Sequence, residues 1–283
     1  MKLIADSGSS KVEWCLLDGS NVLKTVYTTG LNPIVLTGEE IAQYIGQELV
    51  PQMGEYMDSV KSIHFYGAGC KDSYTNKQII DALRSHFGET VAIDVESDLV
   101  GAARGLFGDD EGIACILGTG SNSGYYDGRK IADHVSPLGY ILGDEGSGAV
   151  LGRHLLGDVL KHQLPEELAS QFREEYDIDN VDVIKRVYCD PMPNRFLASL
   201  TPFLLKHIDE PSIHRLVLNE FKSFFVRNVS NYSGYRKMPV GFVGSVAFYF
   251  RPVLQEAAVA LDAHLGEVIK SPMEGLVRYH ICH

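Results

Sequence analysis

Residues 113–122 read Ile-Ala-Cys-Ile-Leu-Gly-Thr-Gly-Ser-Asn, an apolar stretch that runs into a turn of glycine and small polar residues. Residues 4–10, Ile-Ala-Asp-Ser-Gly-Ser-Ser, have the same design near the N-terminus. Asp18-Gly19 follows the earlier copy and Asp127-Gly128 the later one. Each pair is a strong β-hairpin signal, because glycine permits the positive φ that a tight turn requires. The repeated pattern predicts a duplicated hairpin and therefore two related domains.

Outward from these turns, strand and helix patterns alternate along the first half of the chain, whereas helical spacing dominates after Asp144. The sequence therefore predicts an α/β fold with two sheets and a helical insertion in the second half. We expect the halves to join at the acidic run Asp109-Asp110-Glu111, giving domains at residues 1–110 and 111–283. A last helix is expected from about Pro272, and its packing back onto the first domain is left open.

Composition excludes several classes of protein. Among 283 residues, Lys plus Arg number 25 and Asp plus Glu 37, so the net charge is −12. An acidic surface repels phosphate backbones, which argues against a nucleic-acid partner. No apolar run approaches the roughly 18 to 20 residues of a membrane span, and the N-terminus lacks the apolar region of a signal peptide. We therefore expect a cytoplasmic protein with no membrane partner.

The five cysteines lie singly along the chain, and no CxxC pair occurs. They are Cys15, Cys70, Cys115, Cys189 and Cys282. Isolated cysteines are typical of reduced, mostly buried thiols and exclude zinc-knuckle and iron–sulfur patterns.

The two glycine-containing turns are candidate phosphate sites, because small residues let a phosphate approach the backbone closely. There is no GxxxxGK[ST] motif, which excludes a P-loop. Gly118-Thr119-Gly120 resembles the start of a dinucleotide fingerprint, but residues 125–128 read as strand and turn rather than as the required helix. A structural role for both turns remains the alternative.

Three acidic positions carry two interpretations each. Asp6 at the end of the first strand either holds Mg²⁺, directly or through water, or caps its own turn. Asp98 after Ser97 is either a general base at a sheet edge or an acid favoured by the helix dipole. Asp144 lies in Gly-Asp-Glu-Gly-Ser-Gly at 143–148, where the acids either cap the long helix that follows or, as three glycines favour, form a loop that presents carboxylates to a polyhydroxyl ligand.

Three further polar residues are interpreted as structural or exposed. Asn32 precedes Pro33 in a turn, and composition alone makes it structural. His280 and His283 lack the i, i+4 spacing of a metal pair, so we expect both to be exposed to solvent.

Four motifs together resemble a known family. They are Asp6-Ser7-Gly8-Ser9-Ser10-Lys11, Gly118-Thr119-Gly120-Ser121-Asn122, Gly143-Asp144-Glu145-Gly146-Ser147 and Val243-Gly244-Ser245. Their order is similar to that in the sugar kinase/actin/heat-shock-chaperone superfamily. Within it, the chain resembles the N-acetylglucosamine kinases of the BadF/BadG/BcrA/BcrD-type ATPase family, over nearly its whole length.

This resemblance implies two ribonuclease H-like, actin-like ATPase domains with ATP, Mg²⁺ and a sugar bound in an interdomain cleft, in a homodimer. It implies that Asp98 is the base for the 6-hydroxyl of N-acetylglucosamine, and Asp6 is kept as the metal residue on its position at the end of the first strand. By motif position it assigns ATP contacts to Gly8, Ser9, Ser10, Lys11, Thr119, Gly120, Gly244 and Ser245. It assigns sugar contacts to Asn32, Ser121, Asn122 and Asp144.

One departure and two rival functions follow. Animal-type relatives carry Gly-Gly-Trp-Gly where this chain has Ser-Pro-Leu-Gly at 136–139, a change that bears on N-acetyl specificity. A rival function is an ATPase that activates a 2-hydroxyacyl-CoA dehydratase-type enzyme, against which the isolated cysteines argue. Another is a non-catalytic nucleotide or sugar sensor, which would need neither Asp6 nor Asp98.

Overall fold

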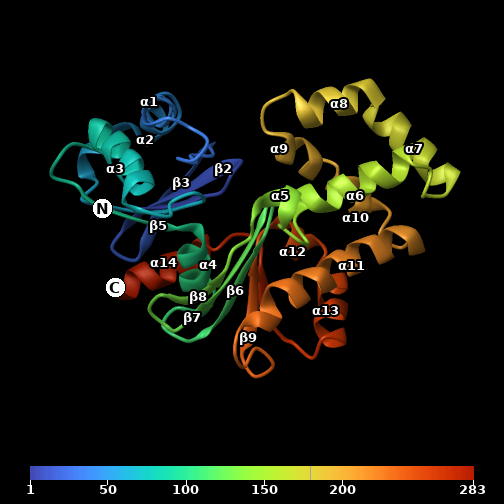
Figure 1. Ribbon diagram of the computed structural model, residues 1–283. Coiled ribbons are helices and arrows are strands. Elements are labelled where there is room, and N and C mark those ends of the chain that lie inside the picture. The colour runs from blue at the N-terminus through green and yellow to red at the C-terminus, as the bar shows by residue number, and fades with distance from the viewer. Residues whose placement is uncertain (179) are drawn as a thin grey trace. The chain divides into compact units, whose positions relative to one another are not determined.

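A computed structural model describes residues 1–178 and 180–283, and the chain divides into two compact units (Figure 1). Unit 1 comprises Met1–Glu111, Asp127–Ile131 and Ser271–His283, and unit 2 comprises Gly112–Tyr126 and Ala132–Lys270. The sequence-based bounds of 1–110 and 111–283 differ from these units at residues 127–131, which lie in unit 1. The C-terminal 13 residues also lie in unit 1, the arrangement that the sequence left open for the last helix. In residues 127–131 the reason is local: a side chain on Gly128 would come within 2.4 Å of the Asp109 carbonyl oxygen.

Unit 1 contains a mixed five-stranded sheet with the order β3-β2-β1-β4-β5. Its strands are β1 (Lys2–Ser7), β2 (Lys11–Asp18), β3 (Asn21–Thr29), β4 (Ser62–Gly67) and β5 (Ala92–Ser97). The first three form an antiparallel meander, and β4 and β5 add parallel to β1. The predicted hairpin is confirmed: β2 ends at Asp18, and Gly19 in the turn has φ +57°.

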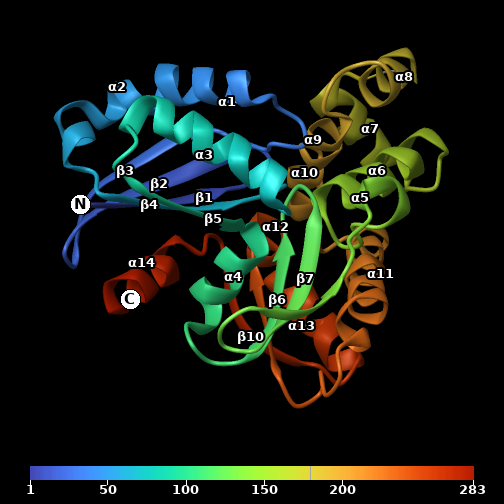
Figure 2. The ribbon, with the colours of Figure 1, turned by 60° about the vertical axis from the view of Figure 1, so that its left-hand side comes forward.

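Helices cover both faces of this sheet. On one face lie α1 (Gly38–Tyr44) and α3 (Ser73–Phe87), and on the other α4 (Asp98–Phe107) and α14 (Met273–Cys282), as Figures 1 and 2 show. The link from α1 to β4 is η1 (Ile45–Leu49), α2 (Val50–Met53) and η2 (Gly54–Ser59). Separate apolar clusters fill the two faces, so α14 completes a core that is otherwise made by β1, β2, β4 and α4.

Unit 2 repeats the same sheet with the order β10-β9-β6-β7-β8. Its strands are β6 (Gly112–Leu117), β7 (Ser121–Tyr126), β8 (Ile131–Val135), β9 (Pro239–Val243) and β10 (His264–Ile269). Strands β6 and β7 are antiparallel, and β9 and β10 are parallel to β6. Strand by strand this is the order of unit 1, which confirms the duplicated α/β fold.

The helices of unit 2 occur in two stretches of the chain, one between β8 and β9 and the other between β9 and β10. They are α5 (Gly139–Leu142), α6 (Gly148–Leu160), α7 (Glu166–Tyr176), α8 (Asn180–Tyr188), α9 (Pro193–Ala198), α10 (Thr201–Lys206), α11 (Pro211–Arg227), η3 (Val229–Asn231), α12 (Ser245–Tyr249) and α13 (Arg251–Ala260). Phe221, Phe224 and Phe225 of α11 pack in one buried cluster with Phe242 of β9. In the described parts of the chain, no helix combines the length and apolar character that crossing a membrane requires.

Candidate functional site

The first glycine-containing turn, Gly8–Ser10, is a tight connection between β1 and β2. The Gly8 N–H donates to the Lys11 carbonyl at 3.0 Å, which closes the turn. Gly30, at the end of β3, lies directly against it: a side chain there would come within 2.6 Å of the Gly8 carbonyl oxygen. The next residue, Leu31, exchanges hydrogen bonds with the buried Ser7 hydroxyl at 3.2 Å. The chain leading to Asn32 is thereby attached to the turn.

Asp6 and Asp98 form an electrostatically coupled pair in unit 1. Asp6 ends β1, and Asp98 opens α4, where the Ser97 hydroxyl caps the helix by accepting the Val100 N–H at 3.3 Å. Burial, followed by the charges of Asp98 and Glu13, raises the pKa of Asp6 to about 7. Burial also raises the pKa of Asp98 to about 6, against the effects of the Leu99 N–H and the Lys71 charge. Both carboxyls thus titrate near neutral pH, as is common for groups that bind cations or move protons.

The segment after β4 connects Asp98 with Asn32. Cys70 is buried, and burial together with the Asp98 charge raises the pKa of its thiol to about 12. Gly69 has φ +87°, and a side chain there would come within 2.2 Å of Asn32 Oδ1 and 3.3 Å of Ile34 Cγ1. Asn32 Oδ1 accepts the Ile34 N–H at 2.9 Å, so the interpretation of Asn32 as a turn residue is confirmed. Asn32, Ile34 and Asp98 therefore all border the Gly69–Lys71 segment.

The second turn, Gly118–Gly120, connects β6 and β7 in unit 2. Its carbonyls are held by α6, since the Gly148 N–H donates to Gly118 at 2.8 Å and the Ala149 N–H to Thr119 at 3.0 Å. Gly244 packs against its start: with φ +121°, a side chain there would come within 2.3 Å of the Leu117 carbonyl oxygen. The predicted residues Thr119, Gly120 and Gly244 therefore lie on adjoining backbone segments, and Ser245 follows as the exposed first residue of α12.

The loop at 143–148 gives its two acids different roles. Asp144 is buried with φ +52°, and burial and then the Glu145 charge raise its pKa to about 6, against the Ser121 and Gly139 N–H groups that hydrogen bond to it. Glu145 instead forms an ion pair with Arg227 and accepts from Asn228 Nδ2 at 3.2 Å. The loop is thus anchored to α11 through Glu145, and the Asp144 carboxylate lies against the second turn.

Packing explains the glycines of this loop. A side chain on Gly143 would come within 2.0 Å of the Pro137 carbonyl oxygen. Gly146 has φ +71° and lies against Phe221, and Gly148 contacts the Gly118 carbonyl oxygen. Close contacts therefore require these glycines, whatever ligand the loop binds.

Ser121 and Asn122 differ in their surroundings. Ser121 is buried at the start of β7, and its N–H is a partner of the Asp144 carboxylate. Asn122 is half-buried, and its Oδ1 accepts from Ser123 N–H and contacts His134 Nε2, each at 2.9 Å. Ser121 thus belongs to the Asp144 cluster, and Asn122 is held by the β7–β8 hairpin.

Several residues that support these clusters were missed in the sequence. Gly30 and Gly69 are required by close contacts from distant segments, and Ser147 caps α6 by accepting the Val150 N–H at 3.2 Å. For Gly30 and Gly69, the signal that the sequence offers is the glycine residue itself, which permits such close contacts. For His280 the prediction of exposure was wrong, because the side chain is buried on the α14 face of unit 1.

A metal ion would find few protein ligands here. Within residues 1–178 and 180–283, no group of three or more His, Cys, Asp or Glu side chains could hold one. Asp6 therefore offers a single carboxylate, which is the usual protein share for Mg²⁺ bound with substrate phosphates and water.

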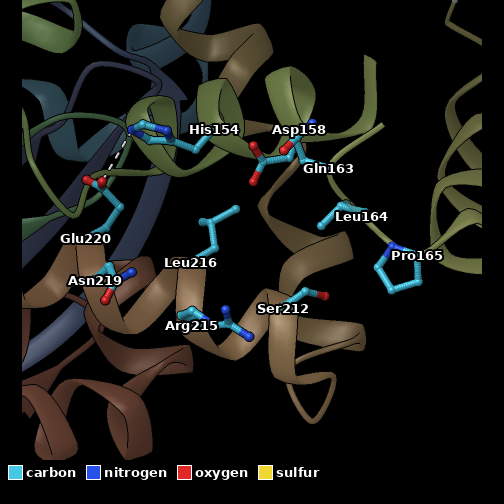
Figure 3. A pocket seen from close by; sticks show the side chains of 10 residues that line it. All are labelled: His154, Asp158, Gln163, Leu164, Pro165, Ser212, Arg215, Leu216, Asn219 and Glu220. Atoms are coloured by element: carbon cyan, nitrogen blue, oxygen red, sulfur yellow. Dashed lines mark ion pairs between the residues drawn. The ribbon is translucent and has the colours of Figure 1, made fainter. Parts of the chain in front are cut away.

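A separate groove of about 670 Å³ lies between α6 and α11 of unit 2 (Figure 3). His154 of α6 pairs with Glu220 of α11 at 3.3 Å at one end of it, and Asp158 and Arg215 line it farther along (Figure 3). None of the predicted site residues lines this groove.

Comparison with solved structures finds similar chains. A protein from Porphyromonas gingivalis, named as a candidate N-acetylglucosamine kinase, is 47% identical, with all of this chain and 99% of that one covered and a TM-score of 0.97. A candidate N-acetylglucosamine kinase from Chromobacterium violaceum is 16% identical, with 98% of each chain covered and a TM-score of 0.66. No family model and no curated protein matches the chain.

The fold is also that of component A of the (R)-2-hydroxyglutaryl-CoA dehydratase from Acidaminococcus fermentans. That chain is 12% identical, with 99% of this chain and 96% of that one covered and a TM-score of 0.52. At this identity the likeness concerns the fold alone. Together the comparisons support the duplicated ribonuclease H-like fold of the actin-like ATPases.

Proposed function

The chain belongs to the N-acetylglucosamine kinase-like family of the sugar kinase fold, and from this premise we propose that it transfers a phosphoryl group from ATP to a sugar hydroxyl. The acceptor in this proposal is the 6-hydroxyl of N-acetylglucosamine. The observation that carries the proposal is the Asp6–Asp98 pair, two carboxyls that titrate near neutral pH beside a glycine-containing turn.

Asp98 is the proposed general base. Phosphoryl transfer depends on positioning and charge stabilisation more than on covalent chemistry. A base acts best when its pKa lies near the working pH, and a pKa of about 6 leaves Asp98 mostly ionised at pH 7 to 8. Asp98 takes the hydroxyl proton as the oxygen attacks the terminal phosphorus and ADP leaves. The Ser97 cap and the Leu99 N–H fix the carboxylate in this role.

In this proposal, Asp6 and the two glycine-containing turns bind the triphosphate of ATP. A buried carboxylate whose ionisation is opposed by burial and by the charge of Asp98 is suited to a cation, so Mg²⁺ fits Asp6, directly or through water. Mg²⁺ bound there would neutralise part of the phosphate charge. Gly118 offers room for a phosphate, because a side chain at that position would meet no atom within 4 Å.

The sugar contacts proposed are Asp144, Ser121 and Asn122 in unit 2 and Asn32 in unit 1. The backbone N–H groups of Ser121 and Gly139 orient the Asp144 carboxylate, which can still accept from sugar hydroxyls. Asn32 uses Oδ1 for its own loop, so its Nδ2 amide is the group that donates to the sugar.

The N-acetyl preference is supported by two exposed apolar residues beside Asn32. Ile34 is 55% exposed and Val35 58%, and Ile34 is the one that lies against Gly69. An acetyl methyl group packed on Ile34 would gain about 1 kcal/mol.

Replacing Ile34 by Ser is expected to raise KM for N-acetylglucosamine about 3- to 10-fold and to leave KM for glucose nearly unchanged, since glucose lacks the acyl group. Steady-state kinetics with both sugars measure this, and Val35→Ser is the matched control with little effect on either. An equal change for the two sugars would place the acetyl contact elsewhere.

The activity should fall in acid. Because Asp98 must be ionised to accept a proton, kcat/KM is expected to decrease tenfold per pH unit below an apparent pKa of about 6. The rates are measured at saturating Mg²⁺, because Mg²⁺ bound at Asp6 would favour the charged form of Asp6 and so remove the titration of Asp6 from the pH profile. Rates measured from pH 5 to 8.5 test this, and a flat profile would contradict the role of Asp98.

The function itself is tested by ADP release with hexoses, amino sugars and N-acetyl amino sugars. Stimulation by N-acetylglucosamine is expected, and stimulation by no sugar would favour the activator or sensor hypotheses. An activator would hold an iron–sulfur cluster with cysteines of paired subunits. Cys115 is fully buried, which opposes this, whereas Cys189 is exposed, and an iron assay on anaerobically purified protein measures the cluster directly.

A further inference from the structure

The C-terminal helix α14 packs on α4, the helix that begins with Asp98. The two helices touch through backbone: a side chain on Gly275 would come within 1.8 Å of the Gly105 carbonyl oxygen. Gly105 is equally restricted by Pro272. The two helices therefore leave no room for a side chain at this crossing.

Beside this crossing, His280 of α14 is the centre of a buried polar network. Its side chain is 6% exposed, and Nε2 lies 2.9 Å from the Tyr66 hydroxyl on β4. Arg104 of α4 donates to the same hydroxyl from Nη1 at 3.0 Å. The Tyr66 hydroxyl can accept from Arg104 and donate its own proton to Nε2, an arrangement that requires neutral His280 with Nε2 unprotonated.

Arg104 extends the network to the start of α4. It pairs with Glu96 at 3.7 Å, two residues before Asp98, and its guanidinium lies 5.7 Å from the Tyr66 ring centroid and 5.2 Å from that of Tyr279. Gly101 of α4 rests on the Tyr66 ring, where a side chain would come within 2.8 Å of Cβ. Tyr66 and Arg104 thus set the distance of α4 from the sheet.

The charges around His280 favour its neutral form. Facing it are Lys2 on β1, His64 on β4, Asp94 on β5 and Arg104 on α4, with Tyr66 and Tyr279 as further titratable neighbours. The His64 ring centroid is 4.1 Å away, and Lys2 Nζ donates to the His280 carbonyl. Burial, followed by His64, Lys2 and Arg104, lowers the pKa of His280 to about 3.

We propose that His280 is a positioning residue for Asp98, acting through the Tyr66 hydroxyl and Arg104 on helix α4. The proposal rests on the proposed function in that Asp98 is the base. With the network intact, α4 presents Asp98 at a fixed place on the sheet edge. Without a hydrogen-bond acceptor at position 280, the Tyr66 hydroxyl and Arg104 rearrange. Helix α4 is then no longer held at a fixed position on the sheet.

The test compares His280→Leu, which removes the acceptor, with His280→Gln, whose amide oxygen can still accept from Tyr66. We expect Leu to lower kcat at least tenfold with KM for sugar and ATP changed less than about twofold, and Gln to stay within about threefold of wild type. His283→Leu on the same helix end is exposed and should match wild type. Equal losses in the Leu and Gln variants, or a folded Leu variant with wild-type kcat, would overturn the proposal.

Tyr66→Phe provides a second route if His280→Leu fails to fold, because it deletes only the hydroxyl and keeps the ring that supports Gly101. It should lower kcat to the same extent as His280→Leu. A readout independent of turnover is the Asp98 carboxyl pKa from NMR titration, which should change in His280→Leu and Tyr66→Phe and remain fixed in His283→Leu. If wild type shows no sugar-dependent ADP release, the proposed function fails, while an unchanged Asp98 titration in both variants is what refutes the positioning role.

Discussion

Replacing Asp98 by Asn is expected to lower kcat about 10²- to 10⁴-fold while ATP binding and the fold persist, because the amide cannot accept the hydroxyl proton. The same change should stabilise the protein at neutral pH. Burial raises the pKa of Asp98 from its ordinary 3.8 to about 6, so ionising it in the folded state costs free energy. That cost is fully present above pH 6 and disappears as the pH falls toward 4.

The stabilisation is measurable as the difference between variant and wild type. At pH 8 Asp98→Asn should raise the free energy of unfolding by about 1 to 3 kcal/mol, and near pH 4 by almost nothing. Asp81→Asn, at an exposed position of α3 that pairs with Lys77, is the matched control and should alter neither activity nor stability appreciably. If Asp98→Asn keeps more than about a tenth of the activity, Asp98 is not the base.

The second large effect is expected from Gly244→Ala. Gly244 has φ +121° and ψ 159°, a region that is essentially restricted to glycine, and its methyl would lie 2.3 Å from the Leu117 carbonyl oxygen. Strain of this kind costs about 1 to 3 kcal/mol. Relief of the clash displaces the Gly118–Gly120 turn, so we expect KM for ATP to rise at least tenfold and the protein to unfold at lower temperature.

Gly157→Ala in α6 gives the control, since a side chain there meets no atom within 4 Å. Alanine in a helix interior should stabilise by about 0.5 to 1 kcal/mol and leave KM for ATP unchanged. Thermal unfolding and ATP-dependent kinetics separate the two variants. Wild-type stability and KM in Gly244→Ala would show that the second turn does not depend on this contact.

Sequence reasoning succeeded where the determinant is local. Asp18-Gly19 and Asp127-Gly128 carry their turn chemistry in two adjacent residues, so both hairpins, and the duplication they imply, could be predicted. The N-cap Ser97 and the strand before it could also be predicted from the sequence. Asp98 was therefore correctly placed at the start of a helix.

The failures involve contacts between distant segments. His280 appeared exposed because nothing near it in the chain reveals Tyr66 or the Gly105–Gly275 crossing. The sequence also could not separate Asp144 from Glu145, because the difference lies in an ion pair with Arg227 on α11. The roles of Asp98, Asp6 and the sugar contacts stay predictions, since they depend on ligands.

The membership of α14 in unit 1 has a consequence for biosynthesis. Residues 271–283 leave the ribosome after all the other residues of unit 1, yet Met273 and Leu276 fill a core whose other members, such as Ile4, are made much earlier. Domains usually fold one after another, N-terminal first, during translation. Unit 1 therefore keeps an uncovered apolar face until residues 271–283 have been made, and nascent chains stalled before α14 should depend on chaperones.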